Sequence, residues 1–357
     1  MKKAIALLLV LTMVFALAAC GKTEAPAETP AENPAEAPAE PTTETPAETA
    51  PVYDEVNMKL SHVNAIDQPI GKAFDDFAAL VKERSGGKVI IDVYPASSLY
   101  SNEDAQAAIQ LGNLDMCLAD VSSLSSDIPA FALYGLPFLY DSYDTMAKIA
   151  YGDIGAKLDE MLKDELGVIA MGWGWNGFRN ICTRDPITCI ADCKGYKLRS
   201  PGLDLYLDTF NLLGMSPTII PWGDCYTGMQ SGVVDGVETT TEAIYTQGFY
   251  TLGKNVCLSR HMLSVVGLLI NEAKFESLNA DTQALLMECW DECRQALNET
   301  VAGEEDEYVE KLREAGCNIT KFEDRDEVVA LFTPYWQEQA EKGGYTDLLE
   351  AAMALMN

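Results

Sequence analysis

Histidine is almost absent from this chain, which restricts the chemistry it can perform. Only two histidines, His62 and His261, occur in 357 residues, and they are far apart in the sequence. Histidine is the most common side chain for proton transfer near neutral pH, so few catalytic arrangements are available. The patterns G-x-S-x-G, H-E-x-x-H and Walker A are also missing. We therefore expect a protein that is not an enzyme and that needs no cofactor.

Basic residues are scarce as well. The chain has 25 Lys and Arg against 55 Asp and Glu, a formal net charge of −30. Nucleic acids and anionic lipid surfaces attract proteins through basic patches, so neither is an expected partner. Against this background, two short apolar segments that are typical of strands each hold an arginine. They are Phe178–Thr183, with Arg179, and Tyr196–Arg199, with Arg199.

A buried arginine needs an anion. Its guanidinium keeps its proton in proteins and presents a rigid fork of donors. Leaving it buried after a partner is removed costs about 3–5 kcal/mol. Each of these two arginines should therefore contact an internal Asp or Glu, or the carboxylate of a bound molecule. We interpret Arg199 as the arginine that waits for a ligand, in a closable gap between two lobes and without a permanent internal counter-ion.

Long hydrophobic runs are absent except at the N-terminus. Ala4–Leu17 follows Lys2 and Lys3 and is too short to span a membrane. The Leu17-Ala18-Ala19-Cys20 sequence that ends it matches a bacterial lipobox, although a chance cysteine in an ordinary secreted protein is the alternative. Residues 1–20 are therefore predicted to be a lipoprotein signal peptide, with Cys20 lipidated. The mature protein is expected at the cell membrane, on its extracytoplasmic face, anchored by this lipid.

The next segment, residues 21–52, repeats proline, alanine, glutamate and threonine. Its frequent prolines exclude a helix, and it has almost nothing apolar to bury. We predict a disordered tether that separates the folded part from the membrane.

The remaining nine cysteines are an odd number, so at least one thiol is free unless it bonds to another molecule. Cys189/Cys193 and Cys289/Cys293 are C-x3-C pairs without a nearby histidine, which does not favour a zinc site. We predict no metal and expect most of these cysteines to serve as small buried residues.

Strand-like and helix-like segments alternate through the folded part, which predicts an α/β fold with a mostly parallel sheet covered on both faces. The expected strands are Val56–Asn64, Lys88–Tyr94, Asn113–Leu118, Gly167–Gly172, Phe178–Thr183, Tyr196–Arg199, Ser216–Ile220, Val233–Glu238 and His261–Asn271. The expected helices are Gly71–Ser85, Glu103–Gly112, Tyr140–Lys163 with a break at Gly152, Leu203–Leu213, Trp222–Gly232, Leu278–Gly316, Asp324–Glu341 and Tyr345–Met356. The long helix Leu278–Gly316 is long enough to cross two lobes.

Gly172–Gly177 formally satisfies the dinucleotide pattern G-x-G-x-x-G. That pattern must open a helix, whereas here it leads into a strand-like segment. We interpret it as a hinge between lobes, with Trp175 packed there or facing the cleft.

Three other polar residues follow expected strand ends, where open α/β sheets bind ligands. His62, Asp67 and Asp120 are therefore candidate site residues, with a helix cap or a turn as the alternative role for the two acids. If they acted together on a bound acid, the protein would be a secreted enzyme. His261 is expected to have a structural role.

A series of motifs in one order gives the chain a family resemblance, from about Met58 to the C-terminus. The motifs are Gly112-Asn113-Leu114-Asp115-Met116, Leu136-Pro137-Phe138-Leu139, Gly177-Phe178-Arg179, Cys193-Lys194-Gly195-Tyr196-Lys197-Leu198-Arg199-Ser200-Pro201 and Met229-Gln230-Ser231-Gly232-Val233-Val234-Asp235-Gly236-Val237-Glu238. In this the chain resembles the DctP-type solute-binding proteins of TRAP (tripartite ATP-independent periplasmic) transporters.

The resemblance implies two lobes joined by a long helix and closing on a small organic acid. Lobe I would comprise residues 53–176 plus 265–304, and lobe II residues 177–264 plus 305–357. Arg199 would be the principal carboxylate clamp, Arg179 a second arginine and Trp222 an aromatic contact. Thr239 stands where many members have asparagine, which shortens the polar reach. Asp120 is the nearest match to a polar residue used by the sialic-acid members.

The resemblance also implies a function. The protein would be a monomeric receptor that captures a small carboxylate-containing acid and delivers it to a separate TRAP membrane permease. A sensor that presents the acid to a receptor kinase is the alternative, and a secreted enzyme a more distant one.

Overall fold

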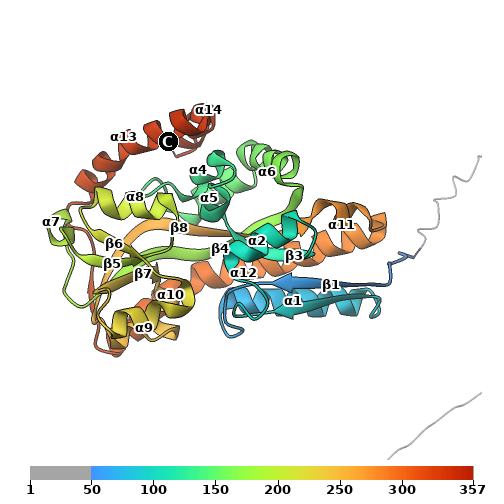
Figure 1. Ribbon diagram of the computed structural model, residues 1–357, viewed down its shortest axis with the longest axis horizontal. Helices are drawn as coiled ribbons and strands as arrows, with labels where there is room; N and C mark the ends of the chain where they lie inside the picture. Colours follow the sequence, from blue (N-terminus) through green and yellow to red (C-terminus); the bar gives the residue numbers. More distant parts are fainter. Residues whose placement is uncertain (1–49, 357) are drawn as a thin grey trace, which may run out of the picture. The chain divides into compact units, whose positions relative to one another are not determined.

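The computed structural model describes residues 50–356 (Figure 1). The predicted signal peptide, Cys20 and nearly all of the predicted tether lie outside the described residues. The strands are β1 (Val56–Ser61), β2 (Val89–Tyr94), β3 (Met116–Asp120), β4 (Val168–Thr183), β5 (Lys197–Ser200), β6 (Ser216–Ile219), β7 (Gly236–Thr240), β8 (Asn255–Asn271) and β9 (Asn318–Thr320).

These strands form one nine-stranded sheet with the order β2-β1-β3-β8-β4-β7-β5-β6, and β9 pairs with β8. β1, β2 and β3 are parallel to one another, and so are β5, β6 and β7. The long strands β4 and β8 lie between these two groups and pair antiparallel with each other, with β3 and with β7. The prediction of a mostly parallel sheet is therefore wrong for its two longest strands, because direction cannot be read from an apolar run.

The register of the long strands brings the carboxyl ends of both parallel groups towards the middle of β4. Asp120, the last residue of β3, pairs with Val266 of β8, which pairs in turn with Gly174 of β4. Thr240, the last residue of β7, pairs with Arg179 of β4. Residues that follow β3 and β7 therefore face each other across a short stretch of β4.

Helices cover both faces of the sheet (Figure 1). They are α1 (Pro69–Arg84), α2 (Asn102–Gln110), α3 (Val121–Leu124), α4 (Ala132–Gly135), α5 (Tyr143–Ala150), α6 (Asp153–Leu166), α7 (Ile190–Cys193), α8 (Asp204–Leu212), α9 (Cys225–Gln230), α10 (Thr241–Thr246), α11 (Glu272–Glu276), α12 (Ala280–Glu314), α13 (Arg325–Gly343) and α14 (Thr346–Ala354), with 3-10 turns η1 (Pro129–Phe131), η2 (Trp222–Asp224) and η3 (Phe249–Thr251).

Two large apolar cores hold these layers to the sheet. On one face, α4, α6, α8, α13 and α14 pack around Trp173, Phe210 and Phe332. On the other face, α1 and α12 pack around Phe74 and Trp290, whose rings stack at 5.2 Å. A smaller core near α9 and α10 completes the second face. Burial on both sides explains why β8 reads as an almost continuous apolar run.

The long helix is confirmed as α12, which has 35 residues and is about 50 Å long. It begins after Asn279, whose side chain accepts a hydrogen bond from the Thr282 backbone N–H. Lys311 and Arg313 lie in its last turn, where cations favour the helix dipole.

The Gly172–Gly177 segment differs from the prediction. Two strands joined by a glycine hinge were expected, but β4 is continuous through the segment, with shifts of register against β8 between Ala170 and Gly172 and between Trp175 and Gly177. Gly172 and Gly177 have φ of 140° and 105°, which other residues rarely adopt. The glycines therefore form β-bulges within one strand. The division into two lobes stays a prediction.

All nine cysteines of the described residues are free, and all except Cys189 are buried. Their predicted role as small buried residues is thus confirmed for eight of the nine. Residues 50–356 include no helix that is both long enough and apolar enough to span a bilayer.

Candidate functional site

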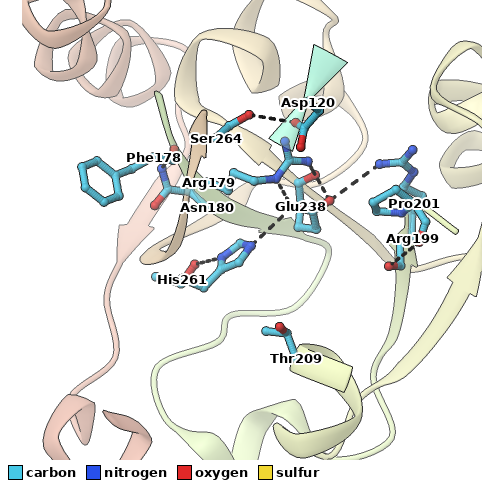
Figure 2. Close-up of polar contacts among 12 residues, drawn as sticks. Asp120, Phe178, Arg179, Asn180, Arg199, Pro201, Thr209, Glu238, His261 and Ser264 are labelled. Atoms are coloured by element: carbon cyan, nitrogen blue, oxygen red, sulfur yellow. Dashed lines mark hydrogen bonds and ion pairs between the residues drawn. The ribbon is translucent and has the colours of Figure 1, made fainter. Parts of the chain in front are cut away.

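A cluster of buried charges lies where the two groups of strands meet (Figure 2). Arg179 comes from β4, Arg199 from β5, Glu238 from β7 and His261 from β8, while Asp120 ends β3. Arg179 and Arg199 are 7% and 4% exposed, and Glu238 is fully buried. The structure thus brings together both arginines and Asp120 from the predicted site, and adds Glu238 and His261.

Glu238 binds Arg179 through two parallel hydrogen bonds. Arg179 Nε donates to Oε2 at 2.6 Å and Nη2 donates to Oε1 at 2.8 Å, while Nη2 also donates to the Glu238 carbonyl. Burial would raise the pKa of Glu238, but the charge and hydrogen bonds of Arg179, with a hydrogen bond from His261, lower it to about 2. Burial would likewise lower the pKa of Arg179, and Glu238 outweighs that effect and raises it. This pair is fully ionised and geometrically fixed.

Arg199 is bound far less completely. Its Nε donates to the carbonyl of Ile220 at 2.9 Å, and its nearest carboxylate contact is Nη1 to Glu238 Oε1 at 3.6 Å. Within residues 50–356 its Nη groups make no hydrogen bond. Burial lowers the pKa of Arg199, with Cys225 and Glu238 opposing that effect only in part. The prediction that Arg199 has no internal counter-ion is therefore wrong, because Arg199 and Arg179 both contact Glu238. The contact of Arg199 with Glu238 is the longer and weaker of the two.

Trp222 and Tyr206 supply aromatic faces to the two guanidinium groups. The Arg199 Cζ atom lies 5.6 Å from the Trp222 ring centroid, and that ring packs edge-on against Phe249. Arg179 Cζ lies 5.1 Å from the ring centroid of Tyr206, in α8. Such contacts stabilise a cation by about 0.5–2 kcal/mol, more as water is removed.

Asp120 lies beside Arg179 but accepts its hydrogen bonds from neutral groups. Oδ1 accepts from the backbone N–H of Ser122, and Oδ2 from the Ser264 hydroxyl at 3.3 Å. Burial raises the pKa of Asp120, and the charge of Arg179 limits that rise. The residue also caps α3, which is the alternative role predicted for it, and its role in ligand binding stays a prediction.

His261 joins the cluster as a neutral group. Its Nε2 lies 3.3 Å from Glu238 Oε2, and its Nδ1 lies 2.8 Å from the Ser259 hydroxyl. Burial lowers its pKa, although Glu238 acts in the opposite direction. Its expected structural role is consistent with this position, where it orients Glu238.

Four other predicted site residues lie outside the cluster. His62 packs against Phe74, with ring centroids 5.0 Å apart, and Trp175 is buried against Tyr151. Asp67 is exposed. Thr239 is buried on β7, but successive side chains of a strand point to opposite faces, so Thr239 points away from the face that Glu238 occupies. Their roles in binding stay predictions.

Glu238, His261 and Tyr206 were not predicted as site residues. Glu238 had a signal: a carboxylate inside a strand-like segment must find a cation if it is buried. Tyr206 had none, because it occupies one of several apolar positions in α8.

The three residues of the enzyme alternative, His62, Asp67 and Asp120, do not meet in the structure. Among residues 50–356 no hydrogen bond or ion pair joins His62, Asp67 and Asp120, and no group of three or more His, Cys, Asp or Glu side chains is arranged to hold a metal ion. What the cluster presents is a buried cation with free donors.

Comparison with known proteins agrees with the fold and the motif order. The family model for DctP, "Bacterial extracellular solute-binding protein, family 7", matches residues 60–343. The C4-dicarboxylate-binding protein DctB of Bacillus subtilis is 31% identical over 277 residues, which is 76% of this chain and 78% of DctB. A solute-binding protein of Sulfitobacter sp. is 27% identical over 285 residues, covering 79% of this chain and 86% of its own length.

Solved structures are similar over nearly their whole length. A TRAP periplasmic solute-binding protein of Sulfitobacter sp., with bound α-D-taluronate, superposes with a TM-score of 0.78 at 26% identity and covers 84% of this chain and 97% of its own. The corresponding protein of Sulfurospirillum deleyianum, with bound succinate, gives 0.79 at 25% identity and covers 85% and 99%.

Fold, motif order and these matches define the class as an extracytoplasmic solute-binding protein of the TRAP type. The chain belongs to family 7 of the bacterial extracellular solute-binding proteins, the DctP family.

Proposed function

We propose that this protein captures a small organic acid by its carboxylate at Arg199 and delivers it to a separate TRAP membrane permease. We further propose that it is a monomer held at the extracytoplasmic face of the membrane by a lipid on Cys20. The anchor is supported by the lipobox sequence, and the permease by the family. Fractionation of cells would test the anchor, since a protein found wholly in the soluble fraction would contradict it.

The observation that carries this proposal is the unequal sharing of Glu238. Arg179 uses two of its nitrogens on Glu238 at 2.6 and 2.8 Å, whereas the nearest Arg199 nitrogen is 3.6 Å away. A ligand carboxylate can therefore bind the Nη groups of Arg199 without displacing the Arg179–Glu238 pair. Two parallel hydrogen bonds to a guanidinium fix the orientation of a carboxylate as well as its affinity.

The surroundings of Arg199 favour such binding. Trp222 supports the guanidinium and offers an apolar surface to the rest of the acid. The carboxyl ends of β3 and β7 face each other across a short stretch of β4. Closing of the two predicted lobes there would remove water from the ion pair and strengthen it. Micromolar affinity needs only about 8 kcal/mol in total.

The identity of the acid can be tested directly. Native mass spectrometry of the purified protein, followed by release and identification of any bound molecule, is expected to yield a carboxylic acid. Succinate and uronates are the first candidates to titrate, because similar proteins were solved with succinate, taluronate and galacturonate bound. A released molecule that has no carboxylate or other anionic group would contradict the proposal.

Arg199→Ala is expected to weaken binding of that acid by at least about 30-fold, the effect of removing about 2 kcal/mol or more of a buried charge contact. The fold should survive, since Glu238 keeps its two bonds to Arg179. Isothermal titration calorimetry measures the affinity and circular dichroism the fold. Arg313→Ala is the control, because Arg313 is exposed on α12 and its ion pair within residues 50–356 is with Glu310. Equal affinities for the wild type and the Arg199→Ala variant would contradict the proposal.

A further inference from the structure

A hydrogen bond links the turn that follows β1 to the helix that follows β7. Gln68 Nε2, just before α1, donates to Glu242 Oε2, in the first turn of α10, at 3.3 Å. α10 begins directly after Thr240, which pairs with Arg179. The contact therefore bridges the same two groups of strands between which a solute bound to Arg199 would lie.

Gln68 is oriented by its own turn. It is 3% exposed, and its Oε1 accepts hydrogen bonds from the Ala65 backbone N–H at 3.0 Å and from Asn64 Nδ2 at 3.3 Å. Because a backbone N–H can only donate, it must face the amide oxygen, which leaves Nε2 turned towards Glu242. The turn lies directly on α1, since a Cβ atom at Gly71 would come within 2.2 Å of the Ala65 carbonyl oxygen. Gln68 is thus fixed to the β1–β3 group.

Glu242 is oriented by α10 in the same way. Its Oε1 accepts a hydrogen bond from the Thr246 hydroxyl, one turn further along the helix, at 2.9 Å. The helix itself is capped by Thr240, whose hydroxyl accepts from the Ala243 backbone N–H. The second carboxylate oxygen of Glu242 is the one that contacts Gln68, so each side of the contact is held by its own element.

Apolar packing beside this contact is sparse. A narrow cavity lies next to it, lined by Pro69 of α1, Thr241 of α10 and the middle of α12. Residues 298–308 of α12 include no fully buried side chain, whereas Leu297 and Leu312 on either side pack into two different apolar cores. The hydrogen bond therefore contributes much of the attraction between the turn and α10.

We propose that Gln68 and Glu242 hold the site closed over a captured solute and so set the rate at which it is released. This inference rests on the proposed function. Neither side chain has to touch the solute, because each acts through the position of its own element. Loss of one hydrogen bond to a carboxylate is expected to speed release about tenfold.

Exchanging the two side chains tests the pair. Gln68→Glu keeps an acceptor for its own turn and places two carboxylates face to face, while Glu242→Gln places two amide donors face to face. The double variant restores one donor and one acceptor with their roles exchanged, so it isolates the coupling between the two positions. Gln295→Ala is the control, because it removes a hydrogen bond of the same chemistry, to Asp291, within α12.

Stopped-flow fluorescence measures the rates, with succinate and galacturonate as probes and Trp222, beside Arg199, as the reporter. We expect each single variant to raise the dissociation rate constant about tenfold and to change the association rate constant by less than about twofold. The double variant should return dissociation to within about twofold of the wild type, and Gln295→Ala should match the wild type.

Hydrogen exchange of the protein without solute gives a second readout. Backbone amides of residues 64–68 and 241–246 should exchange faster in both single variants and return towards the wild-type rates in the double variant.

The outcomes separate the two proposals. Unchanged dissociation in the single variants, or a double variant as fast as the singles, would overturn this inference and leave the proposed function standing. If neither acid binds the wild type, the result counts against the proposed function, and hydrogen exchange then decides whether the contact holds the two sides together.

Discussion

Glu238 is the residue on which the buried cluster depends. It is fully buried and contacts Arg179, Arg199 and His261 at once. A buried ion pair contributes little net stability compared with apolar residues, but removing one partner leaves the other charge uncompensated.

The Glu238→Gln variant should therefore be less stable by about 3–5 kcal/mol, because two buried arginines lose their shared anion. Urea denaturation measures the free energy of unfolding. Glu310→Gln, on the exposed surface of α12, is the control and should change stability by less than about 0.5 kcal/mol. If both variants lose a similar amount of unfolding free energy, Glu238 does not neutralise the buried charge of the two arginines.

His62 should make stability depend on pH. It is 2% exposed and neither ring nitrogen has a partner within residues 50–356, and burial lowers its pKa from 6.5 to about 4. The unfolded chain therefore binds a proton at a higher pH than the folded chain does. The His62 contribution is fully present above pH 6.5 and is lost as the pH falls towards 4, by roughly 3 kcal/mol in total.

The comparison of wild type with His62→Leu isolates this contribution, since the carboxylates and His261 titrate in both. The difference in unfolding free energy between the two proteins should change by roughly 3 kcal/mol between pH 7 and pH 4. Parallel stability curves over that range would show that His62 is already protonated in the folded state or is reached by water.

Individual site residues could be predicted from the sequence only where a buried charge requires a partner of opposite charge. Arg179 and Arg199 stood out because an arginine in an apolar strand must meet an anion, and the structure provides Glu238. Which anion each arginine contacts depends on the register of β7 against β4, and that register cannot be read from the sequence of either strand alone. The same limit applies to Thr239 and Trp175, whose direction depends on pleat and bulge.

At the scale of elements, the bulged strand β4 is the most informative. Gly177 has a φ of 105°, and a Cβ atom there would lie 3.3 Å from Thr240 Cγ2. Gly303, inside α12, has ordinary helical backbone and open space around it. The two glycines should therefore respond in opposite ways to the same substitution.

The Gly177→Ala variant should be destabilised by more than about 1 kcal/mol, because alanine resists a positive φ. Gly303→Ala should be stabilised by up to about 1 kcal/mol, since alanine favours a helix interior more than glycine does. Thermal and urea unfolding measure both. If Gly177→Ala is as stable as the wild type, the bulge does not need glycine.

Long helices were predicted well, and several of the short helices were not. α1, α12 and α13 have helical periodicity over several turns, which identifies them without tertiary contacts. α3, α4, α7 and α10 span only four to six residues, and such helices depend on the contacts around them. β4 read as two strands because glycines at a bulge look the same in the sequence as glycines in a loop.

At the scale of the whole molecule, charge is the dominant feature. With a net charge of −30, the excess carboxylates repel one another across the surface, which destabilises the compact state. The Debye length falls from about 30 Å at 0.01 M salt to about 3 Å at 1 M, which screens exposed charges far more than the buried Arg179–Glu238 pair.

The melting temperature should therefore rise when NaCl is raised from about 0.01 M to about 0.5 M, as measured by differential scanning calorimetry. Choline chloride should give the same rise, because the effect comes from screening and not from a bound sodium ion. A melting temperature that stays constant or falls would mean that local ion pairs outweigh the overall repulsion.

The position of β8 in the sheet affects how the chain can assemble. β8 pairs with both β3 and β4 and so joins the two groups of strands. Neither pairing can form until residues 255–271 have been synthesised, some seventy residues after the end of β4. A polypeptide cut before β8 would hold two separate sets of strands with nothing to join them. Pairings so distant in sequence form slowly. The chain is therefore expected to complete its fold late, a delay that suits a protein whose predicted signal peptide directs it across a membrane before it folds.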